Sequence, residues 1–146
     1  MSTSTPLLAE ETMAIVESTA PILREHGRAI TGHFYENLLR THPEVAPMFS
    51  DPHGLQADRL AAAVLAYATN IRNLEALAPA VQRIAAAHVG AGVQPAQYDV
   101  VGNQLLASMV SVLGEIDVAV LDAWAAAYGV LADILIAEEA TRYAAE

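Results

Sequence analysis

Apolar residues recur at three- and four-residue intervals along nearly the whole chain, whereas the strict alternation typical of strands is scarce. Alanine and leucine are abundant, and clusters of proline and glycine separate the periodic stretches. The pattern predicts an all-α domain of about six to eight helices. The expected helices span about 7–26, 28–41, 55–71, 79–91, 95–114 and 117–146, with a short helical turn at 43–49 and a turn-rich stretch at 50–54. Periodicity alone does not distinguish a helical bundle from other helical folds.

The chain has 146 residues, the size of one ordinary domain, and it shows no internal repeat or linker. We therefore expect a single domain over residues 1–146. Hydrophobic residues make up 54% of the chain and charged residues only 16%, which predicts a large core or a core that also encloses an apolar group. Cysteine is absent, so disulfides, thiolate metal sites and cysteine nucleophiles are excluded.

The formal charge is −10, and all seven basic residues are arginine. Such a chain repels nucleic acid and anionic lipid, so neither is an expected partner. Residues 1–8 lack the basic and apolar segments of a signal peptide. The most apolar stretch, 118–136, is interrupted by Asp122 and Asp133 and is not expected to span a membrane. A soluble, cytoplasmic protein is the resulting expectation.

Among the five histidines, only His88 shares a helical face with apolar residues, namely Val81, Ile84 and Ala85 at offsets of seven, four and three. A cysteine-free protein that binds iron or zinc normally uses histidine. A zinc pair on this helix is not predicted, because no second histidine lies three or four residues away. Two interpretations stay open: a core histidine bonded to a carbonyl, or a single axial ligand of the kind that gas-binding haem needs.

Several other side chains could contribute chemistry, and these are Tyr35, Phe49, Gln56, Leu60, Tyr98, Glu138 and Glu139. Taken singly, each has an ordinary structural explanation. A buried tyrosine usually bonds a backbone carbonyl, a glutamine near a helix start is usually solvated, and a glutamate near a helix end usually reaches water. Periodicity does not choose between the two glutamates, because both fall beside the apolar stripe of the last helix.

Their order along the chain adds information that single residues lack. The relevant segments are FYENL at 34–38, HPEV at 42–45 with Phe49, NIRNL at 70–74, IAAAH at 84–88 with AGV at 91–93, Tyr98 with Val101 and Gly102, and AW at 123–124 with AYG at 127–129. In this order they resemble the globin domain of flavohaemoglobins and of single-domain bacterial haemoglobins. The resemblance covers about residues 21–143.

The resemblance implies a globin fold around a pocket for one haem b per chain. His88 resembles the family's proximal iron ligand, and Tyr98 and Glu139 resemble the pair that orients it. An ungapped alignment through residues 132–133 selects Glu139 rather than Glu138.

On the opposite side of the pocket, Tyr35 matches the family's distal tyrosine and Gln56 its distal glutamine. Leu60 matches the apolar residue over the iron. Phe49 matches the phenylalanine that packs against the haem plane.

The function implied by the resemblance is dioxygen binding at ferrous iron, with conversion of nitric oxide to nitrate. Flavohaemoglobins continue into a reductase domain whereas this chain stops at Glu146, so a separate flavin- and NAD(P)H-dependent reductase is an expected partner. The lysine that often precedes the family's proximal histidine is Ala87 here, which bears on how such a reductase docks. The alternative is a non-catalytic oxygen carrier, and a homodimer is compatible with the resemblance.

Overall fold

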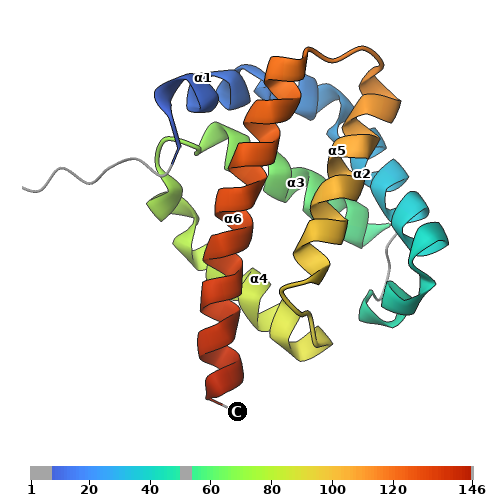
Figure 1. The fold of residues 1–146 in the computed structure, drawn as a ribbon, viewed down its shortest axis with the longest axis vertical. Helices are drawn as coiled ribbons and strands as arrows, with labels where there is room; N and C mark the ends of the chain where they lie inside the picture. The colour runs from blue at the N-terminus through green and yellow to red at the C-terminus, as the bar shows by residue number, and fades with distance from the viewer. Residues whose placement is uncertain (1–7, 50–53, 146) are drawn as a thin grey trace, which may run out of the picture.

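The computed structural model describes residues 8–49 and 54–145 and is built from helices throughout (Figure 1). The described elements are α1 (Glu10–Ser18), α2 (Ala20–Thr41), the 3₁₀ helix η1 (Pro43–Met48), α3 (Leu55–Thr69), the 3₁₀ helix η2 (Leu74–Leu77), α4 (Ala78–Ala91), α5 (Gln97–Leu113) and α6 (Val118–Ala144). No strand occurs within these residues, which confirms the all-α prediction. Most of the predicted turn-rich stretch, residues 50–53, lies outside the described residues.

The predicted break between the first two helices was wrong. α1 ends at Ser18, and α2 begins at Ala20 and continues through Gly27 to Thr41. Pro21 lies in the first turn of α2, where its missing N–H costs nothing, and the Thr19 hydroxyl donates to the carbonyl of Val16 at 2.6 Å. Gly27 costs the helix only about 1 kcal/mol. A Cβ added at Gly27 would lie 3.8 Å from the Cβ of Ala61, so the glycine lies where α3 crosses α2 closely.

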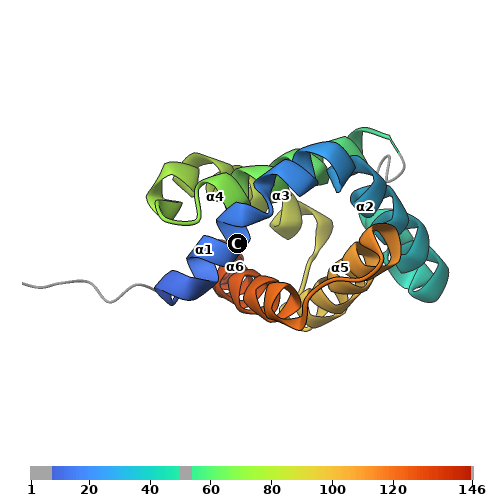
Figure 2. The same ribbon diagram turned by 90° about the horizontal axis from the view of Figure 1, so that it is seen from above.

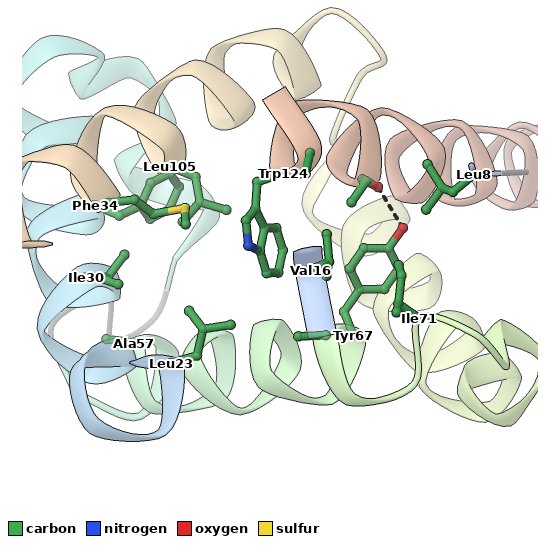
Figure 3. Close-up of a cluster of buried hydrophobic side chains, with 14 of the residues drawn as sticks. Leu8, Val16, Leu23, Ile30, Phe34, Ala57, Tyr67, Ile71, Leu105 and Trp124 are labelled. Atoms are coloured by element: carbon green, nitrogen blue, oxygen red, sulfur yellow. Dashed lines mark hydrogen bonds between the residues drawn. The ribbon is translucent and has the colours of Figure 1, made fainter. Parts of the chain in front are cut away.

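The helices enclose one large core cluster. Seen from above (Figure 2), α3 and α4 lie on one side and α5 and α6 on the other, and α2 packs against both α3 and α5. Trp124 and Tyr67 lie in the middle of the cluster (Figure 3). Their polar atoms are satisfied: the indole N–H donates to Thr19 Oγ1 at 3.1 Å, and the Tyr67 hydroxyl donates to the carbonyl of Ala127 at 2.6 Å.

One helix of the described residues, α6, is long and apolar enough to cross a membrane by length and composition alone. In the fold α6 packs against α1, α4 and α5, and it buries Trp124, Ala127 and Leu135. Part of the apolar surface of α6 is therefore buried in the core of the domain.

The ring of Tyr128 on α6 lies so close to Gly102 of α5 that there is no room for a side chain at Gly102. A Cβ at this position would lie 2.6 Å from Cε2 of Tyr128, whose ring is held because its hydroxyl donates to the carbonyl of Tyr98 at 2.7 Å. We expect Gly102→Ala to lower the free energy of unfolding by about 1–3 kcal/mol, because overpacking outweighs the gain in helix propensity. Urea denaturation measures this. Gly129→Ala is the matched control, since nothing lies within 4 Å of its added Cβ; equal stabilities of the two variants would contradict the prediction.

Candidate functional site

His88 lies in the last turn of α4, and the end of that helix fixes its position. Gly92 follows α4 with a φ of 80°, a conformation that favours glycine. The N–H of Val93 donates to the carbonyl of His88 at 2.9 Å, and the N–H of Gly92 donates to that of Val89 at 3.1 Å. This pair of bonds is a Schellman motif, which ends the helix one turn after His88.

Three polar side chains from three helices meet at one place, namely His88, Tyr98 and Glu139. Nδ1 of His88 lies 2.9 Å from the hydroxyl of Tyr98 on α5 and 3.0 Å from Oε2 of Glu139 on α6. The Tyr98 hydroxyl donates to the same Glu139 oxygen at 2.6 Å. Glu139 is only 3% exposed. The neighbouring Glu138 is turned toward Arg142 instead, so the structure brings Glu139 and not Glu138 to the imidazole.

The arrangement determines which nitrogen of His88 carries the proton. An ionised carboxylate only accepts hydrogen bonds, and the Tyr98 hydroxyl already donates its proton to Glu139. Nδ1 of His88 must therefore be the donor, and in the neutral imidazole this leaves Nε2 with a free lone pair. Burial, followed by the hydrogen bond and charge of Glu139, raises the pKa of Tyr98, so its hydroxyl stays protonated. The His88 side chain is 34% exposed, which leaves its outer edge accessible.

Two tyrosines that the sequence analysis did not select hold this group in place. The Tyr128 hydroxyl donates to the carbonyl of Tyr98 at 2.7 Å, and the Tyr143 hydroxyl donates to the carbonyl of Val93 at 2.6 Å. Both bonds tie the α4–α5 region to α6. The only sequence signal was that a tyrosine in an apolar stripe needs a partner for its hydroxyl, and this does not identify the partner.

A second group of predicted residues gathers around Tyr35 on α2, which is 4% exposed. Its ring contacts those of Phe34 and Phe49 edge-on, at centroid distances of 5.0 and 5.2 Å. Gln56, in the first turn of α3, forms a hydrogen bond with the Tyr35 hydroxyl. Burial raises the pKa of Tyr35 to about 12, although the bond from Gln56 opposes that shift, so the hydroxyl stays protonated at neutral pH.

Leu60 lies one turn along α3 from Gln56 and packs, partly buried, against the core cluster that contains Tyr35. The predicted residues therefore form two groups. One consists of His88, Tyr98 and Glu139 on α4, α5 and α6, and the other of Tyr35, Phe49, Gln56 and Leu60 on α2, α3 and the residue after η1.

The side chains that could bind a metal can be compared with what haem, the cofactor implied by the sequence resemblance, needs. Within residues 8–49 and 54–145, no three side chains of His, Asp or Glu form a cluster that could hold a metal ion. A single imidazole suits a metal that brings its other ligands with it, as haem iron does. An axial histidine binds through a lone pair on Nε2, and a carboxylate that accepts the Nδ1 proton is one of the usual partners that orient such a ligand. The residues of this site therefore fit haem.

Fold and site together define an all-α protein with one imidazole that is positioned, and held in one tautomer, by a buried carboxylate and a tyrosine. Residues 32–135 match the family model for globins. The chain belongs to the globin family, and the predicted globin fold is confirmed.

Similar proteins extend the comparison. The chain is 49% identical over 143 residues to a flavohemoprotein of Bordetella parapertussis, a match that covers 95% of this chain and 36% of the relative. An engineered carbene transferase made from a candidate nitric oxide dioxygenase of Rhodothermus marinus is 37% identical, with a TM-score of 0.91 and coverage of 94% and 97% of the two chains. A flavohemoglobin of Malassezia yamatoensis with bound FAD and heme is 26% identical, with a TM-score of 0.81 over 94% of this chain and 38% of the other. The chain thus spans about a third of the length of the curated relatives.

Proposed function

We propose that the chain holds one haem b through Nε2 of His88 and binds dioxygen on the side of Tyr35 and Gln56. The observation that carries this proposal is the contact of His88 Nδ1 with Tyr98 and Glu139, because it leaves Nε2 as the ligand atom. The haem, when bound, supplies the iron at which dioxygen binds and reacts with nitric oxide.

Glu139 and Tyr98 act as positioning residues for His88. The carboxylate accepts the Nδ1 proton, which fixes the imidazole's tautomer and makes Nε2 more basic. Because Glu139 is buried, this hydrogen bond is not weakened by competition with water.

On the proposed dioxygen-binding side of the haem, Tyr35 is a preoriented hydrogen-bond donor in an apolar environment. Its hydroxyl stays protonated, and the rings of Phe34 and Phe49 fix its orientation and exclude water. Gln56 contacts that hydroxyl and adds a second possible donor through its amide. Preorganised donors of this kind stabilise negative charge that develops on a small ligand.

We further propose that the reaction is dioxygenation of nitric oxide, in which NO, O₂ and one electron give nitrate. The flavohemoprotein relatives and the Rhodothermus marinus neighbour support this assignment. The electron has to come from outside the described residues, and a separate flavin- and NAD(P)H-dependent reductase is the proposed source. The cytoplasm, where such reductases and NAD(P)H are found, is the proposed location.

Nitric oxide consumption tests the catalytic assignment. The haem-loaded chain, supplied with NADH and a general flavin reductase, should consume nitric oxide faster than free haem does and should form one nitrate for each nitric oxide. Reversible oxygen binding with slow autoxidation, but without nitrate formation, would instead establish an oxygen carrier and overturn the enzyme assignment.

The role of Glu139 can be measured separately from activity. In the haem-loaded ferrous protein, Glu139→Gln should lower the iron–histidine stretching frequency in resonance Raman spectra, because a neutral amide accepts the Nδ1 proton more weakly than a carboxylate does. Glu138→Gln is the matched control, since Glu138 pairs with Arg142 and not with His88. A shift in the control variant instead would contradict the assignment of Glu139.

A further inference from the structure

A buried hydrogen bond ties the first turn of α3, which carries Gln56, to α2. The Thr31 hydroxyl on α2 donates to the carbonyl of Ala57, the residue after Gln56, at 2.8 Å. Thr31 is only 2% exposed, and Ala57 is completely buried. Figure 3 shows Ala57 near the start of α3, next to α2. Because water does not reach this bond, competition with solvent does not weaken it.

The Thr31 hydroxyl also has an acceptor within its own helix. A threonine inside a helix usually donates to a carbonyl three or four residues earlier, and the carbonyl of Arg28 lies 3.3 Å from the Thr31 hydroxyl. The hydroxyl has one proton, and the bond to Ala57 is the shorter of the two. A carbonyl oxygen accepts two hydrogen bonds, so Ala57 accepts from Thr31 in addition to its bond within α3. Thr31 therefore joins the two helices.

Both ends of this bond lie next to residues of the candidate site. Thr31 precedes Tyr35 by one turn of α2, and Ala57 directly follows Gln56 on α3. Gln56 in turn forms a hydrogen bond with the Tyr35 hydroxyl. That bond lowers the pKa of Tyr35, as a bond donated to the phenol oxygen does, so the amide is the donor. Two hydrogen bonds thus join α2 to α3 one turn apart, and the buried one fixes how closely the two backbones approach.

An ion pair makes a second contact between α2 and the first turn of α3. Nε of Arg28 lies 2.6 Å from Oδ1 of Asp58. Both side chains are exposed, and surface ion pairs of this kind contribute little to stability, because water and salt screen them. The buried bond from Thr31 is therefore the stronger of the two constraints on the first turn of α3.

We propose that Thr31 is a positioning residue for Gln56: its hydroxyl holds the first turn of α3 where the Gln56 amide meets the Tyr35 hydroxyl. The amide N–H donates to the phenol oxygen, and the single proton of the Tyr35 hydroxyl stays free to point toward a ligand. Loss of the Thr31 hydroxyl lets the first turn of α3 move and separates the pair. The contact between the two helices is independent of haem, whereas its effect on dioxygen rests on the proposed function.

Two substitutions of Thr31 separate the hydroxyl from the shape of the side chain. Thr31→Val keeps the shape and removes the hydroxyl, whereas Thr31→Ser keeps the hydroxyl and removes a buried methyl group. The Gln56 side-chain amide gives an NMR signal in the full-length chain, recorded as the carbon monoxide complex, or haem-free if the chain takes up no haem. Gln56→Leu identifies the signal by its absence. Thr31→Val should shift this signal, because the amide loses its partner, and Thr31→Ser should leave it in place.

Dissociation of dioxygen from the haem-loaded chain is the second measurement. Thr31→Val should speed it by about threefold, because the Tyr35 donor remains but is no longer oriented by Gln56. Thr31→Ser should keep the wild-type rate. Asp58→Asn is the matched control, since it removes the exposed ion pair from the same turn of α3, and it should match the wild type in both measurements. If Thr31→Val does not fold, Thr31→Ala compared with Thr31→Ser isolates the hydroxyl on a smaller side chain.

An unchanged Gln56 signal in Thr31→Val overturns the positioning role. Equal changes in Thr31→Ser and Thr31→Val also overturn it, because packing would then be responsible rather than the hydroxyl. An equal change in Asp58→Asn assigns the role to the ion pair instead of Thr31. If the chain binds no haem, the proposed function fails while the Gln56 signal still tests Thr31, so the two failures are distinguishable.

Discussion

Replacing His88 with alanine is expected to weaken haem retention by roughly a hundredfold or more, since loss of even an outer-shell partner costs ten- to a hundredfold in metal affinity. The variant removes Nε2, the one nitrogen that the contacts of Tyr98 and Glu139 leave free. It also leaves Glu139 buried with Tyr98 as its remaining partner in the group. Transfer of haem to an excess of a haem-scavenging protein, followed through the Soret band, measures the effect.

His33→Ala is the matched control for this experiment. His33 lies on α2, where its Nδ1 bonds the Ser108 hydroxyl at 3.1 Å, and it belongs to neither group of the candidate site. The control should retain haem as the wild type does. Added imidazole should restore the Soret band of His88→Ala, because it supplies the missing ligand atom without repairing a general defect in folding. Equal haem retention in His88→Ala and the wild type would show that another residue holds the iron.

The fold could be predicted wherever local signals agreed with packing. Gly92 ends α4 through a left-handed residue, and Asp117 caps α6 by accepting from the N–H of Ala119 at 3.1 Å; both ends were predicted closely. The helix end predicted at Gly27 was wrong, because a glycine inside a helix costs only about 1 kcal/mol. The close packing of α3 against α2 at Gly27 offsets that cost. Pro21 was the better signal, since proline is favoured in the first turn of a helix.

The candidate site was less predictable, because its decisive contacts join residues far apart in the chain. Glu138 and Glu139 are adjacent and lie equally near the apolar stripe, and only the packing of α6 against α4 and α5 separates them. Tyr128 gave no indication in the sequence of its bond to the carbonyl of Tyr98, thirty residues away. The resemblance selected Glu139 by alignment, whereas the structure gives the physical reason: Arg142 attracts one carboxylate and Tyr98 the other.

Replacing Tyr35 with phenylalanine should speed dissociation of dioxygen from the haem-loaded protein by about 5- to 150-fold, which corresponds to the loss of a hydrogen bond of about 1–3 kcal/mol. Phenylalanine preserves the edge-on contacts with Phe34 and Phe49, so the change removes little more than the hydroxyl. Burial keeps the pKa of that hydroxyl at about 12. The wild-type rate should therefore be constant from pH 6 to pH 9, and it should rise only when the phenol loses its proton at much higher pH.

Stopped-flow displacement of dioxygen by carbon monoxide measures this rate. Tyr67→Phe is the matched control, because Tyr67 is also buried with a pKa raised to about 12, but its hydroxyl donates to the Ala127 carbonyl and not into the candidate site. The control should lose stability and keep the wild-type dissociation rate. If Tyr35→Phe also kept that rate, the donor would be Gln56 or water, and Gln56→Leu would then separate the two. Acceleration in both tyrosine variants would indicate a loosened core instead, because Tyr67 shares only the hydrophobic core cluster with Tyr35.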